Sequence, residues 1–227
     1  AQGKNVLYIT LEMAEERIAE RIDANMMNVP IQDLKDLPKK MFDDCVTKIK
    51  DRIDGRLIIK EYPTGSATVL TIRNHIEKLL LKGFVPGLVV IDYADIMRSS
   101  RSYDSLRHEL KLVYEELRNL AMDMNIPVWT ASQANREASN ASVVGLENMS
   151  EAYGKAMVAD VVVSLSRKPM EKATGAGRLF VAKNRAGRDG ILFPVYLDTS
   201  MSKISIIENQ SEMSLSEVVQ SDQSDMR

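Results

Sequence analysis

The chain has 227 residues, of which 44% are hydrophobic, and this is enough for one sizeable domain with a real core. The formal net charge of −2 gives no general argument for nucleic-acid binding, which would have to come from local loops. The single cysteine, Cys45, excludes an internal disulfide framework. No apolar run approaches the ~18 residues of a membrane span and no signal peptide is visible, so we expect a cytoplasmic protein.

Apolar runs and periodic apolar positions predict alternating strands and helices in the first part of the chain. The expected strands are Val6–Ile9, Arg56–Lys60, Leu88–Ile91 and Ile126–Ala131. The expected helices are Glu15–Met27, Lys39–Ile53, Ala67–Lys82 and a long one over Leu106–Met124. Buried parallel strands read as short apolar runs, so this alternation indicates an α/β fold with an open, mainly parallel sheet.

The second part of the chain has a different pattern. A short helix around Glu151–Ala159 precedes a strand at Val161–Leu165. Three further strands, at Arg178–Ala182, Ile191–Leu197 and Lys203–Ile207, are separated by tight turns and predict an antiparallel C-terminal edge. Residues 208–227 hold five acidic residues and one basic residue and are rich in Ser and Gln. We therefore expect one folded domain over 1–207 and an acidic, flexible tail over 208–227.

Polar residues stand where three of the expected strands end. Glu12 follows the first strand, Asp92 ends the strand Leu88–Ile91, and Gln133 follows the strand Ile126–Ala131. Ligands bind at the carboxyl edge of such parallel sheets. A carboxylate base, a metal-holding carboxylate and an amide that senses a phosphate are the parts that a nucleoside triphosphatase needs.

A phosphate-binding loop of the form G-x-x-x-x-G-K-[ST] occurs nowhere in these residues. The pair Gly3-Lys4 does not qualify, because Asn5 follows it and no glycine lies five residues before Gly3. The chain also opens without a methionine, almost directly into a strand. We expect it to be a fragment whose P-loop strand, loop and helix lie upstream of Ala1, and we expect the fragment alone to be inactive.

Four sequence blocks in register carry a resemblance to a known family. They are Tyr8-Ile9-Thr10-Leu11-Glu12-Met13, Val90-Ile91-Asp92-Tyr93, Ala131-Ser132-Gln133-Ala134-Asn135-Arg136 and Lys183-Asn184-Arg185. In this order and spacing the chain resembles the DnaB-family replicative DNA helicases, hexameric motors with a RecA-like core. The stretches 21–25, 61–65 and 84–86 look most similar to the T-even-type bacteriophage members. The resemblance extends from Gly3 to about Ile207.

The resemblance implies roles for the strand-end residues. Asp92 would hold Mg²⁺, mostly through water, and Glu12 would polarise the water that attacks the γ-phosphate of ATP. Gln133 would sense the γ-phosphate. The residue-based alternatives are a strand cap for Asp92, a helix-dipole partner for Glu12 and an ordinary connector for the loop after Gln133. Asp95, a second acid close by, is expected to be a solvated or capping residue.

The resemblance also assigns Lys183 and Arg185 to the ATP of a neighbouring subunit, with Arg185 as the arginine finger. Their spacing places both side chains on one face of a strand. The residue-based alternative is a solvated hairpin with Arg188 and Asp189. Nucleotide contacts are thus expected from Asp92, Gln133 and Arg185.

Two loops are implied to contact DNA in the central channel of a ring. One contains Arg98 and Arg101; the other runs from Ser139 to about Lys155 and follows Arg136. The chain departs from the family here, with Ser150-Glu151-Ala152-Tyr153-Gly154-Lys155 where relatives commonly have an Arg-Glu-Ser-Gly type sequence. The residues expected to contact DNA are Arg98, Arg101, Arg136, Glu151, Tyr153, Gly154 and Lys155.

The expected cofactors are ATP and Mg²⁺, and the expected partners are single-stranded DNA, further copies of the chain in a hexameric ring, a primase and a helicase loader. The family implies 5′-to-3′ travel, and a phage-encoded member would act in the cytoplasm of an infected bacterium. Two alternatives remain open: a RecA/KaiC-like ATPase for recombination or regulation, and a non-catalytic oligomerisation module derived from such an ATPase.

Overall fold

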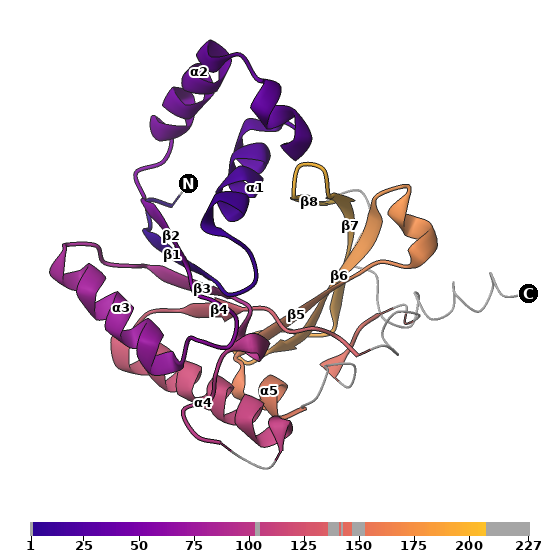
Figure 1. Ribbon diagram of the computed structural model, residues 1–227. Helices are drawn as coiled ribbons and strands as arrows, with labels where there is room; N and C mark the ends of the chain where they lie inside the picture. The colour runs from indigo at the N-terminus through magenta and orange to yellow at the C-terminus, as the bar shows by residue number, and fades with distance from the viewer. Residues whose placement is uncertain (1, 103–104, 136–140, 142, 147–152, 208–227) are drawn as a thin grey trace, which may run out of the picture. The chain divides into compact units, whose positions relative to one another are not determined.

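The computed structural model describes residues 2–102, 105–135, 141, 143–146 and 153–207 (Figure 1). The chain forms two compact units, Ala1–Ser132 and Gln133–Arg227, which are described separately below. The first contains a parallel sheet flanked by helices and the second an antiparallel sheet, so the expected α/β fold class is confirmed. In the described residues the antiparallel strands form a sheet of their own rather than an edge of the parallel one.

The first unit is built on four parallel strands in the order β2-β1-β3-β4. The strands are β1 (Val6–Thr10), β2 (Leu57–Glu61), β3 (Leu88–Asp92) and β4 (Val128–Thr130). The α-helices are α1 (Glu15–Met27), α2 (Lys39–Lys50), α3 (Val69–Leu81) and α4 (Leu106–Met124), and the 3₁₀ helices are η1 (Ile31–Asp36) and η2 (Ala94–Ile96).

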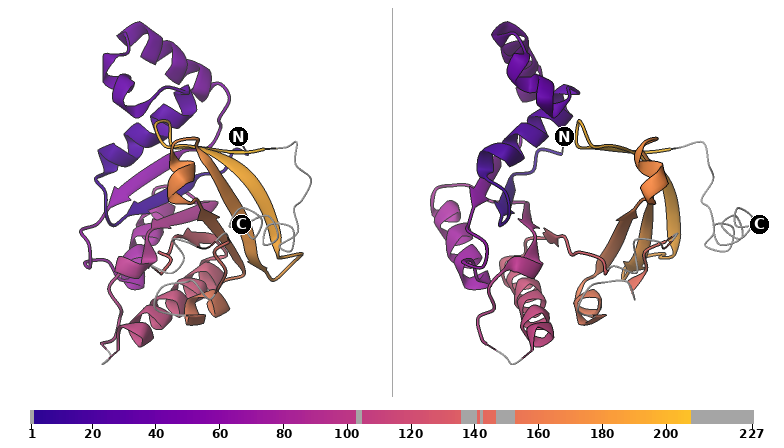
Figure 2. Two further views of the ribbon diagram at one scale, coloured as in Figure 1. Left: turned by 90° about the vertical axis from the view of Figure 1, so that its right-hand side faces the viewer. Right: turned by 45° about the vertical axis from the view of Figure 1, so that its right-hand side comes forward.

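This strand order places helices on both faces of the sheet. The chain moves from β1 outward to β2 through α1 and α2, and then back across the sheet through α3 and α4. Right-handed crossovers that run in opposite directions put their helices on opposite faces. Helices α3 and α4 pack against each other, away from α1 and α2 (Figures 1 and 2).

The core of this unit lies in the central strands, because they are covered on both faces. Leu7, Ile9, Val89 and Ile91 have no exposed surface, which explains their continuous apolar runs. The periodic stripe predicted for the long helix also faces inward, with buried positions at Leu110, Val113, Tyr114, Leu117 and Leu120. Burial of such a stripe is what stabilises an amphipathic helix in a protein.

Local capping explains where the helices begin and end. The Thr68 hydroxyl accepts a hydrogen bond from the Thr71 N–H, so α3 begins two residues after the expected Ala67. Asn28 and Asn125 adopt left-handed conformations directly after α1 and α4, where an αL residue ends a helix. Helix α1 has the predicted bounds, whereas the predicted helix 39–53 is shorter and ends at Lys50.

The second unit contains a short helix and four antiparallel strands in the order β5-β6-β7-β8. The elements are α5 (Tyr153–Val158), β5 (Val161–Ser166), the 3₁₀ helix η5 (Pro169–Lys172), β6 (Ala176–Asn184), β7 (Ile191–Asp198) and β8 (Lys203–Ile206). Its described core is small, with Phe180 and Leu192 packed against Val143 and Ala182. The expected strand 161–165 thus belongs to the antiparallel sheet, paired with β6.

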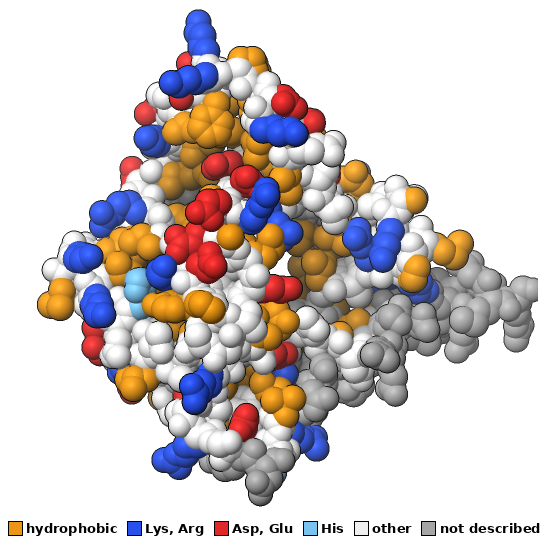
Figure 3. All heavy atoms as spheres, viewed as in Figure 1, with side chains coloured by type: hydrophobic (Ala, Val, Ile, Leu, Met, Phe, Trp, Pro, Cys, Tyr) orange, Lys and Arg blue, Asp and Glu red, His pale blue; other side chains and the backbone are white. Residues whose placement is uncertain are grey.

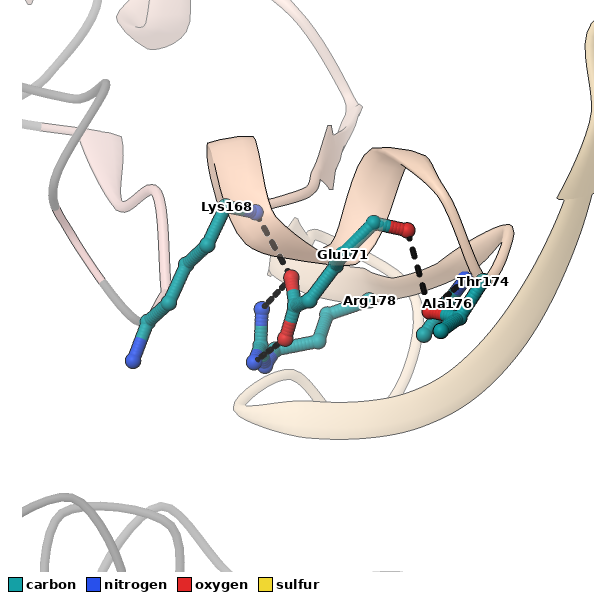
Figure 4. Close-up of polar contacts among 5 residues, drawn as sticks. All are labelled: Lys168, Glu171, Thr174, Ala176 and Arg178. Carbon is teal, nitrogen blue, oxygen red and sulfur yellow. Dashed lines mark hydrogen bonds and ion pairs between the residues drawn. The ribbon is translucent and has the colours of Figure 1, made fainter. Parts of the chain in front are cut away.

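An ion pair joins η5, in the connection between β5 and β6, to strand β6. The Glu171 carboxylate accepts hydrogen bonds from the Lys168 N–H (2.6 Å) and from both terminal nitrogens of Arg178, with Nη1 at 3.0 Å (Figure 4). Partial burial alone would raise the pKa of Glu171, but the hydrogen bonds and charges of Arg178 and Lys168 outweigh it and lower the pKa below its ordinary value. The pair fixes η5 to β6.

No helix in the described part of the chain is both long enough and apolar enough to cross a membrane.

Candidate nucleotide and DNA site

Glu12 and Asp92 lie at the same edge of the parallel sheet. Thr10, the last residue of β1, pairs with Asp92, the last residue of β3. Glu12 lies two residues after Thr10. The Leu11 N–H donates to the Asp92 carbonyl oxygen (2.9 Å), so the turn that carries Glu12 is attached to the end of β3. The structure therefore brings together the two carboxylates that the sequence suggested.

Tyr8 orients the Asp92 carboxylate. Its hydroxyl donates a hydrogen bond to Asp92 Oδ2 at 2.7 Å. Burial, the hydrogen bond to Asp92 and the negative charge of Asp92 raise the pKa of Tyr8 well above its ordinary value, so the hydroxyl stays a donor at neutral pH. Among the described residues no hydrogen bond is found at Asp92 Oδ1, and a carboxylate oxygen so placed suits a metal-bound water. The donor chemistry of this edge fits Mg²⁺.

Hydroxyl groups hold the turn that carries Glu12. The fully buried Thr10 uses its Oγ1 both to donate to the Met13 carbonyl oxygen (2.7 Å) and to accept from the Met13 N–H (3.2 Å). Thr64, from the loop after β2, donates to the Leu11 carbonyl oxygen at 2.6 Å. The backbone on both sides of Glu12 is thereby fixed, while the Glu12 side chain is exposed. This is a suitable placement for a group that must reach a substrate water.

Asp95 is not a solvated or capping residue, contrary to expectation. Its Oδ1 accepts from the Tyr114 hydroxyl (2.7 Å) and its Oδ2 from the Ser132 hydroxyl (2.9 Å). Burial, followed by the charge and hydrogen bond of Asp95, raises the pKa of Tyr114, which therefore remains a donor. The network joins η2, α4 and the residue that immediately precedes Gln133.

A second connection links the ends of β3 and β4. Thr130 Oγ1 donates to the Ile91 carbonyl oxygen (2.9 Å) and accepts from the Ala94 N–H (3.0 Å). Beside it, burial raises the pKa of Tyr93, and the negative charges of Glu12, Asp95 and Asp92 raise it further. The peptide bond between Asp92 and Tyr93 is cis.

Sequence reasoning missed Tyr8, Thr64 and Asp95 as site residues. A tyrosine inside an otherwise apolar strand is a usable signal, because a buried phenol needs a hydrogen-bond partner. Thr64 and Asp95 carry no comparable signal, since their partners come from segments distant in sequence.

Gln133 is the first residue of the second unit, and it is exposed. It follows Ser132 in the chain, the residue whose hydroxyl donates to Asp95. Its role as a phosphate sensor stays a prediction.

Lys183 and Arg185 both lie against the last turn of α5. Lys183 Nζ donates to the carbonyl oxygens of Ala156 (2.8 Å) and Met157 (3.1 Å). Arg185 Nη2 donates to the Met157 carbonyl oxygen (3.3 Å), and Nη1 forms an ion pair with Asp160 (2.6 Å). The structure thus confirms that both cations share one side of the hairpin, and their role at a neighbouring subunit stays a prediction.

The residues expected to contact DNA are described only in part. Arg98 and Arg101 are exposed, whereas Arg136 and Glu151 lie outside the described residues, as does the side chain of Tyr153. Tyr153 and Gly154 begin α5. The Lys155 side chain is only 1% exposed, so it would have to move to reach a phosphate, and its DNA contact stays a prediction.

Basic side chains are not collected in one area of the face shown in Figure 3, where they are mixed with acidic and hydrophobic ones. This distribution agrees with the near-neutral charge of the sequence. Within the described residues there is also no group of three or more His, Cys, Asp or Glu side chains that could hold a metal by themselves. A Mg²⁺ ion at Asp92 would therefore depend on water and on the phosphates of a nucleotide for its other ligands.

Comparisons with known proteins place the chain in a family. The DnaB-like replicative helicase of Enterobacteria phage T4 is 37% identical over 174 residues, which cover 72% of this chain and 36% of that protein. A probable replicative DNA helicase of Trieres chinensis is 30% identical over 200 residues, which cover 82% of this chain and 43% of that protein. The chain thus spans less than half the length of these curated relatives.

Solved structures show the same fold. A DnaB-like replicative helicase whose structure was solved to describe its interactions with primase has a TM-score of 0.75 at 18% identity, over 90% of this chain and 51% of that one. A separately solved ATPase domain has the same score and identity, covering 90% of this chain and 75% of that chain. The family model described as "DnaB-like helicase C terminal domain" matches residues 1–204. With this match over most of its length, the chain belongs to the DnaB-like helicase C-terminal domain family.

Proposed function

We propose that this chain is the motor part of a replicative DNA helicase that hydrolyses ATP and moves along single-stranded DNA in the 5′-to-3′ direction. The observation that carries the proposal is the common sheet edge of Glu12 and Asp92, with fixed backbone on both sides of Glu12. ATP would bind at this edge, completed by phosphate-binding residues from outside the 227 residues, which contain no P-loop motif. Residues 1–207 would act as the motor and 208–227 as an acidic tail.

In this proposal Asp92 and Glu12 divide the work at the γ-phosphate. Asp92, oriented by Tyr8, would hold the waters of Mg²⁺, and the ion when bound with ATP supplies positive charge beside the phosphate oxygens. Glu12 would orient the attacking water and draw its proton, a contribution worth roughly a hundred- to ten-thousand-fold in rate. Because the Glu12 turn is held by Thr10 and Thr64, the carboxylate needs little reorganisation to act.

Lys183 and Arg185 would act on the nucleotide of a neighbouring copy in a hexameric ring. Charge accumulates on the phosphoryl oxygens in the transition state, and a guanidinium placed there stabilises it by about a thousandfold or more. Gln133, which follows the Asp95 network, would report the γ-phosphate to the loop after it. The exposed Arg98 and Arg101 would contact DNA phosphates, a sequence-independent contact that suits a translocating motor.

The partners follow from the same proposal. A helicase of this kind works with a primase and a helicase loader, and we infer the same partners here. The protein would act in the cytoplasm, of an infected bacterium if a phage encodes it.

The test is ATP hydrolysis by the complete natural protein, with and without single-stranded DNA. Arg185→Ala should abolish stimulated turnover, and mixing it with Glu12→Gln subunits should restore part of it, because each variant then supplies the group that the other lacks. Arg188→Ala, which removes an exposed arginine from the same hairpin, is the control and should retain turnover. Intact rings without hydrolysis in the unmodified protein would favour the oligomerisation module instead.

A further inference from the structure

The end of α5 holds both candidate trans-acting cations within one subunit. The carbonyl oxygens of Ala156 and Met157 accept from Lys183 Nζ at 2.8 and 3.1 Å, and Met157 also accepts from Arg185 Nη2 at 3.3 Å. The last carbonyl groups of a helix lack partners within the helix and carry partial negative charge, so cations bind there favourably. The same helix begins with Tyr153, Gly154 and Lys155, which are the candidate DNA contacts.

Asp160 completes this arrangement from the connection between α5 and β5. Its Oδ1 forms the 2.6 Å ion pair with Arg185 Nη1, and its backbone carbonyl oxygen accepts from the Arg185 N–H at 2.8 Å. The backbone bond continues the pairing of β5 with β6 and does not need the carboxylate. The Asp160 carboxylate therefore adds a contact to the Arg185 guanidinium that the strand pairing does not account for.

We propose that Asp160 is a positioning residue that, together with the last turn of α5, holds Arg185 and Lys183 back from the neighbouring nucleotide until DNA displaces α5. The proposal rests on the function proposed above. It assigns to Asp160 a role in making ATP hydrolysis depend on DNA. When DNA binds at the beginning of α5, the shift of its last turn removes the carbonyl acceptors, and the two cations become available to phosphate oxygens.

The exposure of the ion pair sets the strength of this restraint. The side chains of Arg185 and Asp160 are 48% and 61% exposed, and such pairs are weak because water and salt screen them. A triphosphate offers several negative charges to the same guanidinium and would compete successfully once α5 moves. Removing the carboxylate should therefore raise the DNA-free rate by no more than about fivefold, the upper range for an exposed pair.

The experiment compares Asp160→Asn with Asp189→Asn in the complete natural protein. Asp189 is an exposed acid in the same unit and serves as the matched control for the lost charge. Asp160→Asn should raise DNA-free ATP hydrolysis about two- to fivefold while the DNA-stimulated rate changes little, so the stimulation ratio falls. A merely structural role would lower both rates and the melting temperature together. A DNA-free rate equal to that of Asp189→Asn, or lower, would overturn the proposal.

Mixed rings show whether the effect acts across the subunit boundary. Subunits with both Glu12→Gln and Asp160→Asn are mixed with unmodified subunits, and Glu12→Gln subunits alone are mixed in the same ratio as the reference. The double variant should give the higher DNA-free rate, because its released arginine acts on an unmodified neighbour. If Arg185→Ala abolishes hydrolysis but the two mixtures are equal, the proposed function stands and the role of Asp160 fails.

Discussion

In the parallel-sheet unit, Glu12 and Asp92 stand at the ends of strands whose residues alternate between buried and half-buried, whereas in the antiparallel unit Lys183 and Arg185 extend from a hairpin with a small described core. Asp92 and the Glu12 turn are fixed by short hydrogen bonds from the hydroxyl groups of the half-buried Tyr8, the buried Thr10 and the exposed Thr64. Lys183 and Arg185 are held by helix carbonyls and by one exposed carboxylate.

This difference in how the side chains are held suits the different roles proposed for them. A metal-holding carboxylate and a general base must keep their geometry within a subunit, and buried strands with short hydroxyl contacts provide that. Cations that serve a neighbouring subunit must leave one set of partners for another. Weak contacts at a helix end permit such an exchange at small cost in free energy. Substitutions in the two units should therefore have different effects.

The largest expected effect is on catalysis at the fixed edge. Glu12→Gln keeps the size of the side chain and its turn but removes the base, so the rate of ATP hydrolysis by the complete protein should fall roughly a hundred- to ten-thousand-fold. Nucleotide binding, followed by fluorescence, should be nearly unchanged. Glu16→Gln removes an exposed acid from the first turn of α1 and should leave the rate unaltered. Equal losses in both variants would show that general negative charge, not the base, matters.

The second prediction concerns the core of the parallel-sheet unit. Ile72 on α3 has no exposed surface, and Ile72→Ala should lower the free energy of unfolding by about 2–5 kcal/mol. Leu70→Ala on the same helix is the control, because Leu70 is 62% exposed and its loss should matter little. Hydrogen exchange should accelerate in β1 and β3 but not in β6 and β7. Equal acceleration in β6 and β7 would mean that the two units unfold as one.

The third prediction concerns the orientation of Asp92. Tyr8→Phe removes only the hydroxyl that donates to Asp92 Oδ2, so the fold should persist. Losing such an outer contact to a metal-holding carboxylate typically weakens metal affinity about ten- to a hundredfold. The measurement is the Mg²⁺ concentration that half-saturates fluorescent-nucleotide binding by the complete protein. Tyr196→Phe, in the other unit, should not shift it; an unchanged value in Tyr8→Phe would remove Tyr8 from the site.

The sequence predicted most of the first unit because buried parallel strands and amphipathic helices leave clear patterns. Helix Glu15–Met27 and strand Leu88–Ile91 were located within one residue. The polar residues at the ends of the expected strands placed Glu12 and Asp92 at one edge, and the strand pairing confirms that placement. The patterns did not reveal that strand 161–166 pairs antiparallel, because an apolar run does not encode the direction of its partner.

The contacts that hold the site were less predictable. Asp95 was expected to be solvated, yet Tyr114 and Ser132, 19 and 37 residues further along the chain, donate to it. The 3₁₀ helix at Ile31–Asp36 was likewise not expected in a stretch that contains two prolines. Hydrogen bonds between segments distant in sequence depend on how the fold brings those segments together, and no local pattern encodes them.

The smallest expected effect comes from Glu171, an ion-paired acid of the antiparallel unit. Glu171 accepts from Arg178 and from the Lys168 N–H, and its side chain is 23% exposed (Figure 4). Glu171→Gln should therefore lower the free energy of unfolding at neutral pH by only about 1–2 kcal/mol, between the values for exposed and buried pairs. Asp189→Asn, an exposed acid of the same unit, should have almost no effect.

The pH dependence of the Glu171→Gln variant tests whether the charge of Glu171 stabilises the connection between β5 and β6. The folded pKa lies below the ordinary value, because the contacts with Arg178 and Lys168 outweigh the opposing effect of burial. The stabilisation by the ionised Glu171 carboxylate is then fully present above the unfolded pKa, about 4.3. It is lost as the pH falls through the lower folded pKa. Thermal unfolding at pH 7, 5 and 3 should show a constant difference between the two proteins down to about pH 5 and a smaller one at pH 3. A difference that stayed constant to pH 3 would mean that the shape of the side chain, not its charge, fixes η5 to β6.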